Sequence, residues 1–295
     1  MANGSTVEHG YPHLGTVRAA ITALHRHLPP GALHAFATSV TPLDVAFDDA
    51  EDLLPGAQRV ARDMVHHYGL PEARLVIAFR AMDRAATVEL GDGPVYSVEL
   101  NDRFRRHRRD IGAALAHEVA HVYLHRLGLV LPDTAENEVL VDTAAAYLGA
   151  GWLLLDAYRV DGVSSQKLGY LTPEEYGYVL AKRALLFGED PSPWFTSPQA
   201  YPAYLRGAAR ARHDRRQPPL VGAGWAARRR YAADRRRAGS GRAVPSPDDA
   251  YRFEGPPPLR VTFACPTCHQ RLRVPVRGRV RARCGLCRTV LECDT

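Results

Sequence analysis

Apolar and polar residues follow two different periods in the first hundred positions of the chain. Apolar residues first recur at helical spacing, and the pattern then changes to short segments typical of strands. Gly91-Asp92-Gly93-Pro94 lies between the last two of these segments and is a strong turn signal. We therefore predict helices at 16–28 and 57–68, followed by strands at 73–79, 85–90 and 95–100.

Helical patterns return after residue 110 and continue through the next hundred positions. A helix is predicted at 111–126, and no Gly or Pro interrupts it after residue 113. A second is predicted at 134–155, with Thr134 as the capping residue of its first turn. A third, at 172–187, opens with Thr, Pro and two acids, and a short one is expected at 201–212. Helices with a separate small sheet predict an α+β fold.

The helix predicted at 111–126 carries His117-Glu118-Val119-Ala120-His121, an H-E-x-x-H motif. Residues four positions apart lie on one face of a helix, so His117 and His121 can direct two imidazole nitrogens at one point. Zinc accepts two such ligands, and Glu118 lies beside the first of them, where a metal-bound water would be. The alternative is an amphipathic helix whose histidines are solvated or satisfied within the core.

A catalytic zinc commonly has three protein ligands, and the next helix offers the third. His125 lies one turn beyond His121 and would project past the metal, and the later histidines fall near the end of the chain. Glu138 and Asp142 are four positions apart on one face of a mostly apolar helix. We predict Glu138 as the third metal ligand and Asp142 as the acceptor for the outer nitrogen of His117. Solvent exposure of both acids is the alternative.

This combination resembles the gluzincin metallopeptidases, the thermolysin-like clan, in which H-E-x-x-H is followed on a second helix by N-E-x-x-x-D. The resemblance covers His117 to Asp142. The compact chain and His125 look more like the small ImmA/IrrE-type peptidases. The Leu-Met-Pro ending usual in that group is absent, and residues 148–152 have Leu-Gly-Ala-Gly-Trp instead. The resemblance implies a minimal zincin-like domain, made of helices and a small sheet, with one catalytic Zn²⁺.

The resemblance also implies a mechanism of peptide hydrolysis. Zinc would lower the pKa of its bound water, and Glu118 would take the proton of that water and pass it to the leaving amine. The oxyanion needs a further donor. The candidates are Tyr147, Tyr170, Tyr176 and Tyr178. Tyr147, on the ligand helix, is the first choice, and a packing role is the alternative for each. The strand at 95–100 is predicted as a sheet edge that pairs with extended substrate, or else as an ordinary strand.

All five cysteines lie in the last 31 residues of the chain. Two C-x2-C pairs with a fifteen-residue spacer between them have the spacing of a structural zinc site. Four thiolates fill a tetrahedral site, and so short a module needs its metal to fold. The alternating flanks resemble the strands of a zinc ribbon, and Cys293 has no assigned role. We predict one structural Zn²⁺ bound by Cys265, Cys268, Cys284 and Cys287.

The composition changes between the predicted helices and the cysteine module. Residues 206–242 contain twelve arginines among Ala, Gly and Pro, and further prolines follow up to position 258. This composition is typical of a linker. We therefore predict a peptidase domain at 14–205, an Arg/Pro-rich linker at 206–258 and a zinc ribbon at 259–295. The linker is interpreted as a solvated tether, with contact to an anionic partner as the alternative.

Charge and cysteine placement bear on the partners and the compartment. The formal net charge of +6 comes almost wholly from arginine. Nucleic acid or an acidic protein is therefore a candidate partner of the ribbon and linker. The first residues lack an apolar secretory core, no apolar run is long enough to span a membrane, and the cysteines are not spread as in disulfide-stapled proteins. The sequence predicts a cytoplasmic protein without membrane contact.

We therefore expect a zinc-dependent peptidase that hydrolyses a protein or peptide substrate, with the ribbon serving in targeting. Two other classes are open at this point. One is a peptidase-like scaffold without activity, against which the intact Glu118 argues. The other is a nucleic-acid-associated protein that acts through the ribbon and basic linker. SprT-type peptidases also join H-E-x-x-H to a zinc ribbon and act on DNA-bound proteins, but their third ligand is a histidine that this chain lacks.

Overall fold

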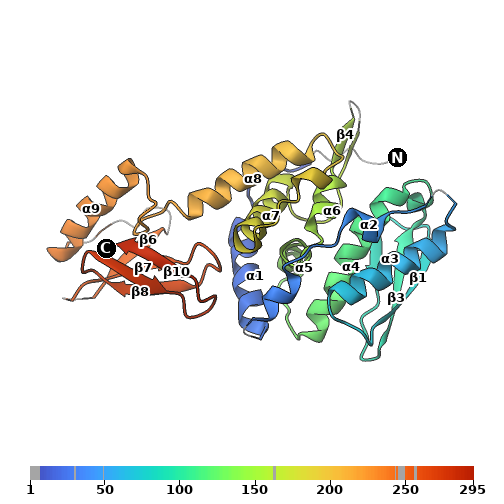
Figure 1. Ribbon diagram of the computed structural model, residues 1–295, viewed down its shortest axis with the longest axis horizontal. Helices are drawn as coiled ribbons and strands as arrows, with labels where there is room; N and C mark the ends of the chain where they lie inside the picture. The colour runs from blue at the N-terminus through green and yellow to red at the C-terminus, as the bar shows by residue number, and fades with distance from the viewer. Residues whose placement is uncertain are drawn as a thin grey trace. The chain divides into compact units, whose positions relative to one another are not determined.

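The computed structural model describes residues 7–29, 31–48, 50–161, 164–242, 244, 250–255 and 258–295. It divides into two compact units, Met1–Ala208 (unit 1) and Ala209–Thr295 (unit 2). Both units combine helices with small sheets, which confirms the predicted α+β class (Figure 1). No helix among the described residues has both the length and the apolar composition needed to cross a membrane.

Unit 1 is mostly helical. Its helices are α1 (Leu14–His27), α2 (Pro42–Val45), α3 (Leu53–His67), α4 (Ile111–Arg126), α5 (Thr134–Tyr147), α6 (Gly151–Asp156) and α7 (Pro173–Phe187), and α8 (Ala200–Asp214) runs across its boundary. Its strands are β1 (Arg74–Arg80), β2 (Ala86–Val88), β3 (Val95–Asn101), β4 (Arg159–Asp161) and β5 (Ser164–Gln166). Short 3-10 turns are η1 (Ala32–Phe36), η2 (Asp102–Arg105), η3 (Arg108–Asp110) and η4 (Ser192–Trp194).

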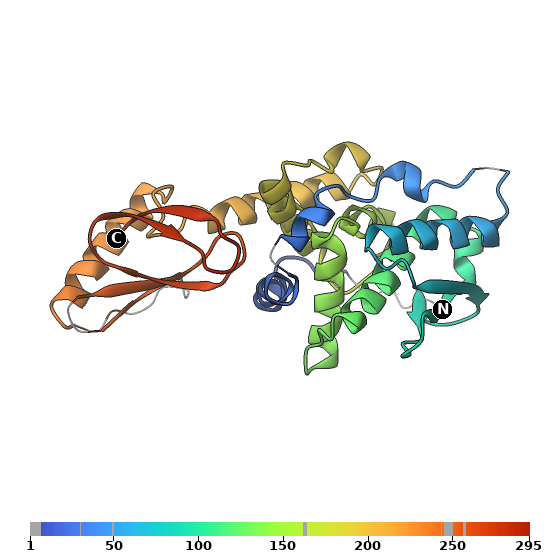
Figure 2. The ribbon, with the colours of Figure 1, turned by 60° about the horizontal axis from the view of Figure 1, so that its bottom comes forward.

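Helices α4 and α5 form the buried centre of unit 1. Twelve of the sixteen residues of α4 are buried, so this helix is enclosed on nearly all sides. It packs against α3, α5 and α6, and α5 packs in turn against α1 and α7. Figures 1 and 2 show α5 between α1 and α4. Because apolar contacts hold both helices from several directions, any polar side chains between them have well-defined positions.

The three-stranded sheet of unit 1 has the order β1-β3-β2. β1 and β3 are parallel, and β2 is antiparallel to β3. The prediction that 95–100 is an edge strand is therefore wrong, because β3 is hydrogen-bonded on both sides. Tyr96, Val98 and Leu100 of β3 are all buried, as a central strand requires. The edge strand on the α4 side is β2, which packs against that helix.

A break separates α5 from α6 at residues 148–150, where the sequence predicted one continuous helix from 134 to 155. Gly149 in this break has a φ of +116°, a conformation that favours glycine. A Cβ at this position would also lie only 3.0 Å from the Cα of Ser39. The break is therefore a consequence of one glycine and the close approach of the chain around Ser39.

The starts of α5 and α7 test two predicted helix caps. For α5, the predicted cap Thr134 is wrong by one residue: Asp133 is the N-cap, and its side chain accepts a hydrogen bond from the N–H of Glu136. For α7, the prediction is confirmed. The Thr172 side chain accepts from the N–H of Glu175 at 3.1 Å, and the Glu175 carboxylate accepts from the N–H of Thr172 at 3.1 Å.

Unit 2 contains a helix packed on small antiparallel sheets. Its elements are α9 (Trp225–Gly239), β6 (Tyr251–Glu254), β7 (Arg260–Ala264), β8 (Arg271–Pro275), β9 (Arg279–Arg283) and β10 (Val290–Asp294). Strands β6, β7 and β8 pair in that order, and β9 pairs with β10. The ring of Tyr231 on α9 lies 4.9 Å from that of Tyr251 and 5.3 Å from that of Phe253. These aromatic contacts fix which face of α9 is buried.

The described part of residues 206–258 differs from the predicted linker. It holds the end of α8, all of α9 and β6, and the boundary between the units falls after residue 208. The sequence did not predict α9 because Tyr231 and Asp234 are its only buried residues, so few large apolar residues recur at helical spacing. Residues 243, 245–249, 256 and 257 of the predicted linker lie outside the described residues.

Glycines allow α7 and α8 to approach closely within unit 1. A Cβ on Gly177 would lie 2.5 Å from the carbonyl oxygen of Ala203 and 2.8 Å from the Cα of Tyr204. A Cβ on Gly207 would overlap the backbone of Gly177. Backbone atoms cannot rotate away as a side chain can, so either methyl group would push the two helices apart.

We expect Gly207→Ala to lower the free energy of unfolding of unit 1 by about 1–3 kcal/mol, the usual cost of overpacking. Gly15→Ala in α1 is the matched control, because no atom lies within 4 Å of the added methyl group. That change should be neutral or stabilise by up to about 1 kcal/mol, since alanine favours helix. Urea unfolding followed by circular dichroism measures both. Equal midpoints for the two variants would contradict the close approach.

Candidate metal centre

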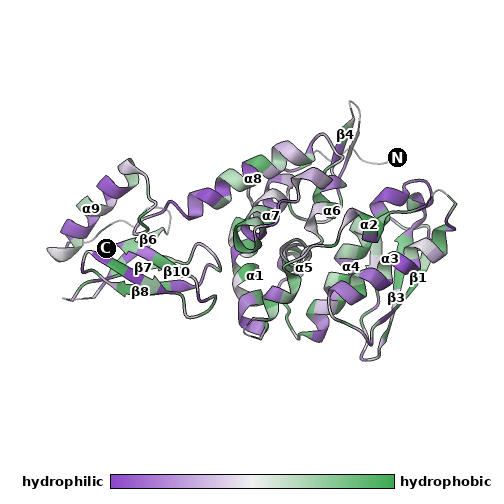
Figure 3. Ribbon diagram, viewed as in Figure 1, coloured by the Kyte–Doolittle hydropathy of each residue, from purple (hydrophilic) through white to green (hydrophobic). Residues whose placement is uncertain are grey.

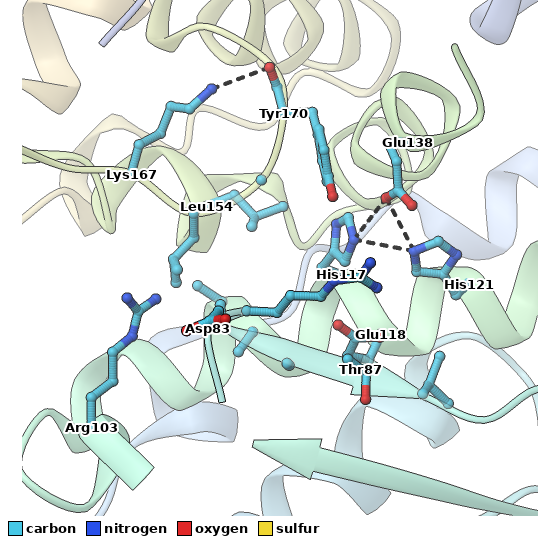
Figure 4. Close-up of a pocket in the computed structure, with 18 of the residues that line it drawn as sticks. Asp83, Thr87, Arg103, His117, Glu118, His121, Glu138, Leu154, Lys167 and Tyr170 are labelled. Atoms are coloured by element: carbon cyan, nitrogen blue, oxygen red, sulfur yellow. Dashed lines mark hydrogen bonds and ion pairs between the residues drawn. The ribbon is translucent and has the colours of Figure 1, made fainter. Parts of the chain in front are cut away.

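Three side chains from α4 and α5 converge at one point in unit 1. α4 presents His117 and His121, whose Nε2 atoms lie 3.1 Å apart. α5 presents Glu138, whose Oε2 lies 3.3 Å from each of those nitrogens. Figure 4 shows the carboxylate facing both imidazoles across the gap between the helices. The structure thus brings together the three residues predicted as metal ligands.

The spacing of these atoms fits a metal ion. Ligand atoms about 2.0–2.1 Å from a tetrahedral metal are about 3.3–3.4 Å from one another, close to the separations of 3.1 and 3.3 Å. Oε2 of Glu138 is buried and has no hydrogen-bond partner within the described chain. A buried carboxylate oxygen without a donor is costly unless a cation compensates it. The three residues could therefore hold a metal ion.

The charges around this point also favour a cation. Burial raises the pKa of Glu138, but its interactions with His117 and His121 lower it more, so that it lies at about 2. Burial lowers the pKa of His117, but the charge of Asp142, its hydrogen bond to His117 and the nearby Glu138 carboxylate raise it well above its ordinary value. The cluster thus stabilises positive charge at its centre, whether a proton or a metal ion supplies it.

Asp142 fixes the orientation of His117 from behind. Its Oδ1 accepts a hydrogen bond from Nδ1 of His117 at 2.8 Å, the contact predicted from the sequence. Its Oδ2 accepts from the backbone N–H groups of Tyr170 and of Leu171, the latter at 3.1 Å. A carboxylate only accepts, so in the neutral imidazole that binds a metal Nδ1 carries the proton and the lone pair of Nε2 points toward His121 and Glu138.

The segment 167–171 closes one side of the site and holds Tyr170 over it. Gly169 has a φ of +78°, and a Cβ there would meet the Tyr176 hydroxyl and lie 2.7 Å from Oδ2 of Asp142. Nζ of Lys167 donates to the carbonyl oxygens of Tyr170 and Leu171 at 3.1 and 2.9 Å. The Tyr170 ring stacks on His117, with centroids 6.0 Å apart and planes at 27°.

The structure does not bring Tyr147 to this site, and its predicted role as the oxyanion donor is not supported. Tyr147 has no solvent exposure, and its hydroxyl lies 3.1 Å from Nε2 of His25 on α1. It follows Glu138 by nine positions, about two and a half helical turns, and so lies on the opposite face of α5. Tyr170, named among the alternatives, is the tyrosine that lines the cleft, and half of its surface is exposed.

From the sequence, Tyr147 was preferred to Tyr170 because it lies on the same predicted helix as Glu138. The segment Leu168-Gly169-Tyr170-Leu171 directly precedes the capping residue Thr172, which anchors the start of α7. A glycine next to a strong helix cap suggests a tightly turned segment, which was the available signal for an ordered loop.

Glu118 lines the same cleft and is 4% exposed. Burial raises its pKa, and the neighbouring imidazoles of His117 and His121 lower it in part. A buried carboxylate with a raised pKa holds a proton closer to neutral pH than an exposed one does, which suits proton transfer. Glu118 follows His117 by one position and so lies about 100° around α4 from it, off the face that carries His117 and His121.

The cleft beside the candidate metal centre has a volume of about 470 Å³. One wall is β2 with its flanking residues, and the other walls are α4, Glu138 and the segment 167–170. Three basic residues, Arg84, Arg103 and Lys167, and three carboxylates, those of Asp83, Glu118 and Glu138, line it, so the cleft carries charges of both signs. All of the predicted site residues of unit 1 except Asp142 and Tyr147 line this cleft.

The four predicted cysteines form a second cluster, in unit 2. Sγ of Cys265 lies 3.6 Å from that of Cys287, and Sγ of Cys268 lies 3.6 Å from that of Cys284. A tetrahedral metal with sulfur ligands at about 2.3 Å places neighbouring sulfurs about 3.8 Å apart. The four sulfurs are close enough to bind one metal ion. Cys293 is also buried in the core of unit 2 but is not part of this group.

The two cysteine turns have the same backbone design. In the first, Cys265 N–H donates to the Gln270 carbonyl at 2.9 Å, and His269 has a φ of 60°. In the second, Cys284 N–H donates to the Thr289 carbonyl at 2.9 Å, and Arg288 has a φ of 63°. The left-handed residue follows the second cysteine of each pair, so both turns aim their sulfurs at a shared centre.

Comparison of the chain with protein-family models, with curated proteins and with solved structures finds no match.

We expect the purified chain to contain about two zinc ions, one at each cluster, by elemental analysis. Glu138→Ala should remove one, because it deletes the only carboxylate ligand of the α4–α5 cluster. Cys284→Ser should weaken or remove the other.

Two matched controls make this count specific. Glu136→Ala removes an exposed acid from the first turn of α5, and Cys293→Ser removes the cysteine outside the cluster. Both should retain two ions. A full metal content in Glu138→Ala would contradict the assignment of Glu138 as a ligand.

Proposed function

We propose that the chain is a zinc-dependent peptidase whose active site is the cleft beside His117, His121 and Glu138. The observation that carries this proposal is the convergence of two imidazoles and a carboxylate next to an open cleft, with Asp142 holding His117 from behind. Two nitrogens and one oxygen suit zinc, and three protein ligands leave a fourth position for water or substrate. This arrangement supports the resemblance to gluzincin peptidases.

The proposed chemistry divides among few residues. A zinc ion bound there would polarise the scissile carbonyl group and lower the pKa of water toward neutrality. Glu118 accepts a proton from the attacking water and delivers it to the leaving nitrogen. Its carboxylate is buried in the wall of the cleft. The phenol of Tyr170 donates a hydrogen bond to the negative charge that develops on the carbonyl oxygen. Burial raises the pKa of Tyr170, so that it keeps its proton at neutral pH.

An extended peptide is the substrate shape that the cleft suits. β2 pairs with β3 on one side only, and residues 83–88 around it line the cleft. The unpaired edge of a strand offers backbone N–H and C=O groups to an incoming peptide strand. We therefore assign substrate pairing to the edge of β2 and not to β3, the strand predicted for this role from the sequence. Strand addition depends on the peptide backbone, so it favours a protein or peptide substrate over other amides.

The cysteine cluster has a different proposed role. Four sulfur ligands complete a tetrahedral site, so no vertex is open for substrate. Unit 2 has a small core that includes Cys265, Cys268 and Cys284, and Cys287 packs against it. A zinc ion there contributes to folding, as in a zinc ribbon, and we propose that fold for the cysteine-bearing strands.

We expect Glu118→Gln to retain zinc and lose peptidase activity by roughly 100-fold or more, because the amide cannot accept the water's proton. Activity is measured on quenched fluorescent peptides of mixed sequence, and zinc is counted in the same samples. Glu136→Gln is the control for removing one acid from unit 1. Equal rates for wild type and Glu118→Gln would rule out hydrolysis with Glu118 as the base and favour a scaffold without activity.

We expect Tyr170→Phe to lower kcat by roughly 100-fold, the usual effect of losing one oxyanion donor, with little change in KM or zinc content. Tyr147→Phe is the control, since its hydroxyl contacts His25 within the core and does not line the cleft. It should change stability but leave kcat within a few-fold of wild type. A larger loss of kcat in Tyr147→Phe than in Tyr170→Phe would reverse the assignment.

A further inference from the structure

The two units of the chain carry opposite charge. Unit 2 has 20 arginines and seven acidic residues, a formal net charge of +13. Unit 1 has 18 basic and 25 acidic residues, a formal net charge of −7. The overall value of +6 therefore conceals one strongly basic unit. With almost three arginines for each acid, internal ion pairs cannot neutralise unit 2, which indicates an anionic partner.

Helix α9 carries the densest part of this charge. Its fifteen residues, WAARRRYAADRRRAG, hold six arginines and one acid, Asp234. Asp234 is buried and accepts a hydrogen bond from the Tyr251 hydroxyl at 2.8 Å. Tyr231 and Asp234 mark the face of α9 that packs against the rest of unit 2. In Figure 3, purple bands from the arginines alternate with pale bands along α9.

The exposed arginines of α9 lie on three sides of the helix. Each residue turns the helix by about 100°, so Arg229 lies opposite the packing face while Arg228 and Arg230 lie on its two flanks. Seven residues later, Arg236 and Arg237 repeat the positions of Arg229 and Arg230, about 10.5 Å further along the axis. Arg235, by contrast, donates to the carbonyl oxygen of Thr295 at 2.7 Å. We call the exposed set the α9 face: Trp225, Arg228, Arg229, Arg230, Arg236 and Arg237.

Trp225 begins the central row of the α9 face. It is 74% exposed, and the guanidinium of Arg229 lies 5.5 Å from its ring centre. Trp225 and Val290 are the only large apolar side chains exposed in the described part of unit 2. A helix that inserts between lipids needs a continuous apolar face, so this composition argues against an inserted membrane helix.

We propose that the α9 face binds double-stranded DNA through its phosphate groups. An α-helix with its side chains is about 10–12 Å across, and the major groove of B-form DNA is about 12 Å wide. Arginines on both flanks of a helix in that groove reach the phosphates of both groove walls. Double-stranded RNA has a deep, narrow major groove that such a helix cannot enter. Duplex DNA carries a regular line of phosphates on each strand, which matches arginines on both flanks of one helix.

The test uses the full chain with Glu118→Gln, so that hydrolysis plays no part, and a fluorescent DNA duplex of about 30 base pairs. Binding is measured by anisotropy between about 50 and 200 mM NaCl, and the logarithm of the affinity is plotted against that of the salt concentration. Each lost phosphate contact makes the slope shallower by about 0.9. Changing the three flank residues Arg228, Arg230 and Arg237 to Gln should therefore make it shallower by about 3.

The control removes the same charge from residues beside the two cysteine turns of unit 2. Arg271, Arg283 and Arg288, which are exposed there, are changed to Gln together. This variant should keep a slope within about one of the parent. Circular dichroism and the metal content of the cysteine cluster show that both variants are folded.

Several results would overturn the proposal. One is an absence of duplex binding at low salt, and another is an equal change of slope in the two triple variants. Tighter binding to double-stranded RNA, to single-stranded DNA of the same length or to polyglutamate would also overturn it. Because the readout is DNA binding by a chain that lacks Glu118, its failure leaves the proposed peptidase activity untouched.

Discussion

A fully buried carboxylate, that of Asp142, is the group on which the candidate site depends. It accepts a hydrogen bond from Nδ1 of His117 on α4 and from the backbone N–H groups of Tyr170 and Leu171 before α7. A buried carboxylate costs several kcal/mol unless its oxygens are well paired. A structure in which the three segments did not meet at Asp142 would therefore be less stable. These contacts point the imidazole of His117 at Glu138 and place the Tyr170 ring beside that imidazole. The hydrogen bonds that stabilise the buried Asp142 carboxylate therefore also determine the geometry of the cleft.

Much of this site could be predicted from the sequence because its information is local. H-E-x-x-H fixes two residues four apart on one helix, and the residues of α4 match the predicted 111–126. Glu138 and Asp142 repeat that spacing on a helix with few other polar residues, so their buried positions had to be explained by a ligand or a hydrogen bond. The cap of α7 and the two C-x2-C turns are also short patterns whose chemistry determines their geometry.

The parts that could not be predicted depend on contacts between distant residues. Strand order decides whether β3 is an edge, and nothing within 95–100 records that β2 pairs on its other side. Tyr147 follows Glu138 on the same helix, but the nine-residue separation turns it toward His25 and away from the cleft. α9 was concealed for another reason. A prediction from composition uses only the average content of each residue type in a segment. Because α9 packs through Tyr231 and Asp234 alone, its average composition is that of a linker.

The most direct test of the central claim, a metal ion held by His117, His121 and Glu138, is a crystal structure of the full chain with anomalous data at the zinc edge. The account predicts an anomalous peak about 2.0–2.2 Å from both Nε2 atoms and from a carboxylate oxygen of Glu138. A second peak at the four cysteines serves as an internal reference for zinc occupancy. A strong cysteine peak with no peak between α4 and α5 would contradict the account.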